Sequence, residues 1–248
     1  APRRRSRGAG KAQLVRDARA HGVEVRPVAI AASDWDATLE RRLDGEPALR
    51  LGLRMVKGLA ETAARRILAA RAVQAFASTQ DLATRAALDR RDLGALADAG
   101  ALRELAGHRH RAAWSVAGVE PPLPLLAGAE IAEGIALLRT PSEGQDIVAD
   151  YRSVGLTLGR HPLALLRARL TRERVLAAEE LWRLADGAAV CTAGLVITRQ
   201  RPMTASGVTF VTLEDETGHI NLVVWLQVAE RQRRALIESR LLEVSGKL

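Results

Sequence analysis

A lysine and a glycine at the join of two apolar stretches are the residues whose types and spacing most suggest chemistry. Lys57 and Gly58 follow the apolar-rich run 51–56, and a segment with arginines at helical spacing begins at Glu61. A turn here leaves the first amides of the second helix without partners, and these amides and the helix dipole attract an anion. Lysine and arginine side chains nearby favour phosphate as that anion.

This pattern predicts a helix-hairpin-helix element that binds the DNA backbone. Gly58 would let a phosphate approach the main chain, and Thr62 could cap the second helix or contact the phosphate. The consensus has a second glycine where this chain has Ala60. An ordinary pair of helices with a solvated basic face is the alternative. The predicted DNA contacts in this element are Val56, Lys57, Gly58, Leu59, Ala60, Thr62, Arg65 and Arg66.

A second copy of this plan follows along the chain. Segments 76–82 and 93–102 repeat the order of helix, glycine turn and helix, with Gly100 at the turn. For Leu82, Leu93 and Leu96 in this copy, we favour core packing over a role in binding.

The composition indicates a globular protein that attracts polyanions. The chain has 248 residues, with 37 basic and 29 acidic side chains and a formal net charge of +8. All but three of the basic residues are arginines, which suit phosphate, although a GC-rich genome also enriches arginine. No apolar run approaches the ~20 residues of a membrane span. A single cysteine, Cys191, and a basic N-terminus without an apolar core favour the cytoplasm.

The sequence pattern of the C-terminal third is typical of a small β-barrel. Strands are predicted over 190–201, 208–214 and 220–225, with a hairpin turn at 215–218, then a helix over 227–237 and a strand over 241–247. Three strands, a helix and a fourth strand is the opening order of an OB-fold barrel, which has five strands. We therefore expect an incomplete barrel.

Such barrels bind single strands through a basic groove and stacking aromatic side chains. Phe210 and Trp225 are the aromatic candidates, and Arg199 and Arg201 are the basic ones. Strand alternation leaves Phe210 equally compatible with burial in the barrel and with base stacking, whereas Trp225, at a strand end, is expected to be exposed.

Catalytic and metal-binding signals are weaker, and we predict no such residue. Asp34 with Asp36 and the run 214–216 lie in predicted turns, where acidic residues are common. His108 and His110 lack cysteine or carboxylate partners, so a solvated or phosphate-facing role is favoured over a metal site.

The remaining chain is predicted to be largely helical. A helix from Ala12 ends at Gly22, a short strand follows, and Ser33 begins a short helix to about Arg42. Helices are expected over 51–56, 61–71, 79–87 with Ser78 as cap, 90–99 and 109–116, and later over 147–151, 162–170 and 178–184. Segment 118–146 is rich in proline and glycine and is typical of a linker.

Five stretches in order resemble one protein family. They are VRDARAHGVEVRPVAIAASDWDATLE, LRLGLRMVKGLAETAARRILAAR, FASTQDLATRAALDRRDLGALADAGALREL, VADYRSVGLTLGRHPLALLR and TFVTLEDETGHINLVVW. Together they are similar to the C-terminal part of bacterial C-family DNA polymerases. The segments SDWDATLE and GLTLGRHPLALLR most resemble the error-prone paralogue of the polymerase III alpha subunit.

The resemblance implies that catalysis and DNA holding belong to different parts of the full enzyme. In that family the palm, with its magnesium-binding aspartates, lies N-terminal to the region matched here, so the chain itself would be non-catalytic and need no cofactor. A full enzyme would perform translesion synthesis after DNA damage, beside a Y-family-like accessory protein and the sliding clamp. The chain would hold duplex or primer-template DNA near the nucleoid. The alternative is a non-functional or protein-interaction remnant of a truncated polymerase gene.

The fold class expected is multidomain α+β, with a tandem helix-hairpin-helix domain followed by an incomplete OB-fold barrel. The expected boundaries are a disordered basic arm at 1–11, a fingers-like end at 12–43, the helix-hairpin-helix domain at 44–117, a linker at 118–146, a helical connector at 147–186 and the OB domain at 187–248.

Overall fold

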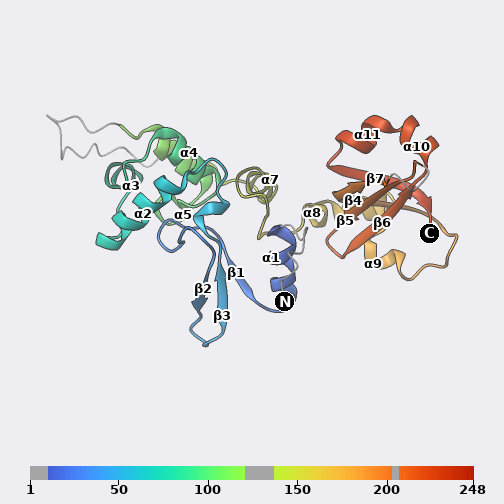
Figure 1. Cartoon of the computed structure of the whole chain (residues 1–248), viewed down its shortest axis with the longest axis horizontal. Coiled ribbons are helices and arrows are strands. Elements are labelled where there is room, and N and C mark those ends of the chain that lie inside the picture. Colours follow the sequence, from blue (N-terminus) through green and yellow to red (C-terminus); the bar gives the residue numbers. More distant parts are fainter. Residues whose placement is uncertain (1–10, 121–136, 203–206) are drawn as a thin grey trace. The chain divides into compact units, whose positions relative to one another are not determined.

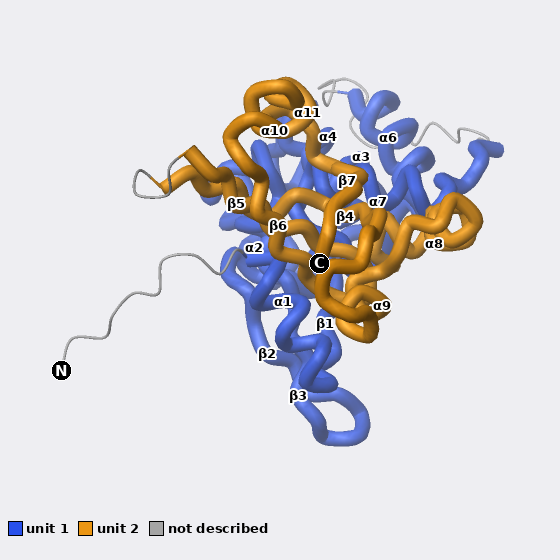
Figure 2. Tube along the Cα trace, turned by 90° about the vertical axis from the view of Figure 1, so that its right-hand side faces the viewer, with its two compact units in different colours: residues 1–159 blue, residues 160–248 orange. Residues whose placement is uncertain are grey.

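The computed structural model describes residues 11–120, 137–202 and 207–248 (Figure 1). The chain divides into two compact units, residues 1–159 and 160–248, which are coloured separately in Figure 2. The predicted basic arm, apart from Lys11, and segment 121–136 of the predicted linker lie outside the described residues. Within the described residues, no helix is both long and apolar enough to span a membrane.

Unit 1 is built mainly from helices around one hydrophobic core. Leu82, Leu93 and Leu96, which we favoured as core residues, are at most 1% exposed. Ser78 caps its helix as predicted, since its hydroxyl accepts a hydrogen bond from the Asp81 amide at 3.0 Å. The helices are α1 (Lys11–Ala20), α2 (Glu61–Val73), α3 (Thr79–Arg85), α4 (Arg90–Asp98), α5 (Arg103–Ala106), α6 (Arg109–Ala117) and α7 (Glu143–Ser153).

A small sheet in unit 1 corrects two predictions. The segment after Ser33 forms a strand instead of the expected helix, and 51–56 contains only one 3-10 turn. The sheet has the order β1-β3-β2, with β1 parallel and β2 antiparallel to β3. Its elements are β1 (Glu24–Arg26), β2 (Thr38–Arg41), β3 (Pro47–Arg50) and the 3-10 turn η1 (Leu53–Met55).

Ion pairs link the strands of this sheet. The Glu40 carboxylate on β2 accepts a hydrogen bond from Arg26 on β1 and another from Arg50 on β3, each at 2.7 Å. A glycine with a φ of +87°, Gly45, makes the turn between β2 and β3. Both ion pairs join residues at least ten positions apart, so the local pattern that indicated a helix could not reveal them.

Helix α7 begins earlier than predicted, at Glu143, inside the expected linker. Ser142 and Gln145 form a capping box: each side chain hydrogen-bonds the other residue's amide. Ile147, on the buried side of the helix, is 3% exposed. The capping box thus starts the helix locally, and the buried side of α7 packs against the rest of unit 1.

Unit 2 contains a four-stranded antiparallel sheet with the order β6-β5-β4-β7. Val211, Leu213 and Ile220 pack on its inner face with Leu181. Strands and helix follow the predicted OB-fold order, so the fold class is confirmed. The elements are α8 (Pro162–Arg172), α9 (Ala178–Leu181), β4 (Ala189–Gln200), β5 (Thr209–Glu214), β6 (His219–Val224), α10 (Leu226–Arg231), α11 (Arg233–Glu238) and β7 (Leu241–Lys247).

The helix predicted over 227–237 is in fact two short helices separated at Gln232. Neither α10 nor α11 buries a residue completely. Without a continuous buried face, tertiary packing does little to extend either helix, and packing is what stabilises most helices in proteins.

The turn between β5 and β6 is structural, because the buried Asp215 carboxylate joins it to α9. It accepts hydrogen bonds from the amides of Ala178 at 2.7 Å, Thr217 at 2.7 Å and Gly218 at 2.9 Å, and from the Thr217 hydroxyl. Burial alone would raise the pKa of Asp215, but these hydrogen bonds outweigh it and hold the pKa below its usual value. Arg167 of α8 adds an ion pair at 3.3 Å.

We predict that Asp215→Asn lowers the free energy of unfolding of unit 2 by about 2–4 kcal/mol, because several donors lose a charged acceptor. The stabilisation by Asp215 is fully present above its unfolded-state pKa of about 3.9 and is lost as the pH falls through the lower folded pKa. Urea titrations at several pH values, followed by circular dichroism, measure both effects. Thr217→Val is the control and should cost only about 1 kcal/mol. Equal losses in the two variants would contradict the central role of Asp215.

Candidate nucleic-acid interface

The bend between η1 and α2 exposes main-chain amides. Gly58 has a φ of +90°, which glycine adopts without steric cost. The N–H groups of Gly58, Ala60, Glu61 and Thr62 donate to no acceptor among the described residues, and all four residues are exposed. Helix α2 has 13 residues, so its dipole adds to the attraction for an anion at this end.

Neighbouring residues fix the bend. Val56 and Leu59 are 2% and 7% exposed and belong to the core. The Lys57 amide donates to the Ser153 carbonyl at 2.8 Å, and the Lys57 ammonium donates to the Tyr151 carbonyl at 2.9 Å. Both carbonyls lie in the last turn of α7. Because a carbonyl carries no net charge, this contact does not neutralise the Lys57 ammonium, which can still attract a phosphate.

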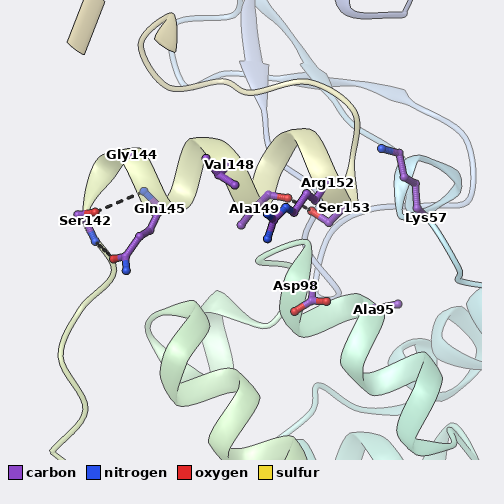
Figure 3. Close-up of a pocket in the computed structure, with 10 residues that line it drawn as sticks. All are labelled: Lys57, Ala95, Asp98, Ser142, Gly144, Gln145, Val148, Ala149, Arg152 and Ser153. Atoms are coloured by element: carbon purple, nitrogen blue, oxygen red, sulfur yellow. Dashed lines mark hydrogen bonds between the residues drawn. The ribbon is translucent and has the colours of Figure 1, made fainter. Parts of the chain in front are cut away.

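An open cavity of about 720 Å³ lies beside the bend, between α4 and α7 (Figure 3). Lys57 and Arg152 are its cationic lining residues, and Asp98 is its acidic one. In Figure 3 the Lys57 ammonium points toward the end of α7 where Arg152 lies. Arg152 is exposed and forms no ion pair among the described residues. The sequence predictions missed this arginine, because only the packing of α7 brings it close to Lys57.

The predicted arginines of α2 have different surroundings. Arg65 is exposed and hydrogen-bonds Glu61 one turn earlier at 2.6 Å. Such surface pairs contribute little, so Arg65 can exchange Glu61 for a phosphate. Arg66 instead donates to the Ala86 carbonyl at 2.8 Å and the Ala87 carbonyl at 3.1 Å, so it helps to hold α3.

The outer face of the OB sheet presents apolar side chains near one end. Phe210 on β5 pairs with Val223 on β6, and the two are 42% and 53% exposed. Trp225 follows β6 directly and is 66% exposed, as expected. The sequence left open whether Phe210 is buried in the barrel or exposed for stacking, and in the structure its side chain is exposed.

The two basic candidates of the OB region differ. The Arg199 guanidinium donates to the carbonyls of Leu236 and Ser239, so it ties β4 to the end of α11. Arg201 lies just beyond β4 and is exposed. The structure therefore brings Arg199 to a helix end and leaves Arg201 at the surface.

The other polar motifs have local structural roles. The His108 ring accepts a hydrogen bond from the Arg111 amide and caps α6, and His110 contacts the Arg139 carbonyl at 2.7 Å. Asp34 and Asp36 form ion pairs with Arg71 and Arg54. Among the described residues, no group of three or more histidine, cysteine or acidic side chains could hold a metal ion.

Two family matches follow the two units. Residues 22–112 match the helix-hairpin-helix motif, a range that includes the small sheet as well as the bend. Residues 190–248 match the OB-fold nucleic acid binding domain. The chain therefore contains two segments of kinds that indicate nucleic-acid binding.

Curated relatives extend the comparison to nearly the whole chain. The chain is 60% identical over 235 residues to the error-prone DNA polymerase of Alkalilimnicola ehrlichii, 54% over 255 residues to that of Methylococcus capsulatus and 55% over 237 residues to that of Pseudomonas paraeruginosa. The sequence matches the C-terminal part of bacterial error-prone DNA polymerases. The alignments cover 95–96% of this chain but only 23–24% of the relatives. The chain thus spans about a quarter of the length of these relatives.

We predict that Gly58→Ala lowers the free energy of unfolding of unit 1 by roughly 1–3 kcal/mol, because alanine is strained at a φ of +90°. The control is Gly94→Ala in α4, where an added Cβ meets open space. Alanine should stabilise that helix by up to about 1 kcal/mol. Thermal denaturation of the two variants measures the difference, and equal stabilities would exclude a strained requirement for glycine at the bend.

Proposed function

We propose that this chain is a DNA-holding part of an error-prone DNA polymerase and that the bend at Gly58 binds a phosphate of duplex or primer-template DNA. The exposed amides of the bend carry the proposal. A phosphate placed there would satisfy donors that have no acceptor among the described residues and would lie at the positive end of the α2 dipole. Lys57 and Arg65 would add charge from either side.

Binding of this kind recognises the backbone and not the bases. Phosphate contacts position a protein on the duplex without reading sequence, and they release counterions. We therefore expect affinity to vary little with DNA sequence and to fall steeply as salt rises. The net charge of +8 adds a general attraction, but the bend supplies the specific contact.

The proposal places the chain within a larger enzyme. The relatives are named error-prone DNA polymerases, and we propose translesion synthesis after DNA damage as the activity that this part serves. Nucleotidyl transfer at magnesium is assigned to no residue of this chain. The Y-family-like accessory protein, the sliding clamp and a place at the nucleoid belong to this proposal for the whole enzyme.

We predict that Lys57→Glu with Arg65→Glu weakens duplex binding by tenfold or more, because each charged hydrogen bond to phosphate contributes about 1.5–3 kcal/mol. The slope of log affinity against log salt should fall by about 1 for each phosphate that the variant no longer neutralises. Fluorescence anisotropy with labelled primer-template DNA at two salt concentrations measures both quantities.

The matched control is Arg231→Glu with Arg233→Glu, which changes the net charge equally at exposed residues of α10 and α11. Because Lys57 also contacts Tyr151, its substitution could affect folding, so melting curves are needed to test that each variant is folded. If duplex affinity fell equally in both double variants, DNA binding would reflect overall basicity and not the bend.

We also propose that the outer face of the OB sheet stacks bases of a single strand. The exposed Phe210 on β5 carries this second proposal. Val223 lies beside it on β6, and Trp225 directly follows β6. A flat, exposed ring on a sheet face is the feature that single-strand-binding barrels use, because every base has a π face. Arg201 would contact the backbone.

We predict that Phe210→Ala weakens binding of a labelled oligothymidine by about 1–3 kcal/mol, the contribution of one stacked base. Trp182→Ala is the control, because Trp182 is 81% exposed and follows α9, whose Leu181 packs on the inner face of the sheet and not on the outer face that presents Phe210. Titration by anisotropy compares the variants with the unaltered chain. Equal affinity in the Phe210 and Trp182 variants would remove the stacking role while leaving the proposed duplex site untouched.

A further inference from the structure

The two hairpins of unit 1 are not equivalent. At the second hairpin, the amides of Gly100 and Ala101 donate to carbonyls of α4, those of Ala97 and Leu96 at 3.0 Å each. The helix that follows, α5, has only four residues. Hydrogen bonding within the chain therefore uses the Gly100 amide of the second bend, whereas the Gly58 amide at the matching position of the first bend has no partner among the described residues.

Arg109 covers the second bend. Its guanidinium would lie 3.1 Å from a Cβ at Gly100, which has a φ of +71°. Its Nε donates to the Asp98 carbonyl at 3.0 Å, and its two terminal nitrogens form ion pairs with Asp146 and Asp150 of α7. The Arg109 side chain is only 13% exposed. A cation that faces two carboxylates from inside the same unit is not available to DNA.

The last turn of the same helix also reaches the first bend. Asp150 is held twice, by Arg109 and by the Thr157 hydroxyl at 2.6 Å. One and three residues further on, the carbonyls of Tyr151 and Ser153 accept the ammonium and the amide of Lys57. Helix α7 therefore links Arg109 at the second hairpin to Lys57 at the first.

We propose that Arg109 is a positioning residue: the second hairpin binds the acidic side of α7 in place of a DNA phosphate, and α7 fixes the first bend for DNA. This inference rests on the proposed duplex site at Gly58. It assigns one phosphate site to the pair of hairpins instead of two. The carboxylates of Asp146 and Asp150 take the place that a phosphate would have at the second hairpin.

The direction in which duplex affinity changes in one double variant distinguishes a positioning role from general electrostatic attraction. Asp146→Asn with Asp150→Asn makes the chain more positive by two charges, so general attraction alone predicts tighter duplex binding. If α7 positions the bend, the same variant binds duplex DNA about fivefold or more weakly, because the coupled site loses its geometry. Asp17→Asn with Glu104→Gln is the charge-matched control at exposed acids and should bind slightly more tightly.

Arg109→Lys is the second variant, because it keeps the charge but loses the planar fork that spans two carboxylates. We expect weaker duplex binding than in Arg103→Lys, a change of the same kind at an exposed arginine of α5. Amide hydrogen exchange of the 248-residue chain supplies the readout that does not depend on DNA. In the Asp146/Asp150 and Arg109 variants, the Lys57 amide should exchange at least fivefold faster, while the buried Ile67 amide keeps its protection.

The outcomes are distinct. Faster exchange at Lys57 with weaker duplex binding supports the inference. Tighter binding in the Asp146/Asp150 variant, or unchanged exchange at Lys57, overturns it even though the unaltered chain binds DNA. Equal loss of protection at Lys57 and Ile67 also overturns it, because the ion pairs would then stabilise unit 1 as a whole. Failure of the unaltered chain to bind duplex DNA at low salt instead refutes the proposed function.

Discussion

The main-chain N–H groups at the start of a helix need hydrogen-bond partners, and the structure of unit 1 depends on how this need is met. A helix start leaves its first amides without acceptors in the helix, and they must find side chains, water or a ligand. At α3, α4, α6 and α7 a polar side chain supplies a cap. At α2 the N-cap is Ala60, which has no side-chain acceptor. The start of this 13-residue helix therefore has no side-chain cap.

Arginine has two separate uses in unit 1. Some guanidinium groups bind main-chain carbonyls and hold elements together: Arg66 joins α2 to the residues after α3, and Arg71 binds the carbonyls of Ile30 and Ser33. Others, such as Arg152, are exposed beside the bend. Arginine serves both purposes because its fork offers several donors in fixed directions. A count of arginines therefore overstates the charge that is free to meet DNA.

Unit 2 also uses a buried carboxylate to hold its elements together. Asp215 accepts several hydrogen bonds at one turn and joins the β5–β6 hairpin to α9, with Arg167 of α8 as its ion-pair partner. Acidic residues at a hairpin turn therefore act in folding here. This network lies at the turn end of the hairpin, and the exposed Phe210 and Val223 lie near its other end.

The sequence by itself determined the features that depend on near neighbours. Helical spacing predicted α2 and α4, Ser78 identified a cap, alternation predicted the strands of the barrel, and the glycine at position 58 predicted a bend. Only the tertiary structure decided that 38–41 forms a strand, that Arg66 and Arg199 bind carbonyls, and that α7 meets Lys57. The Lys57 contact with Tyr151 joins residues 94 positions apart. Local periodicity carries no information about such pairs, because their partners meet only after the intervening chain has folded.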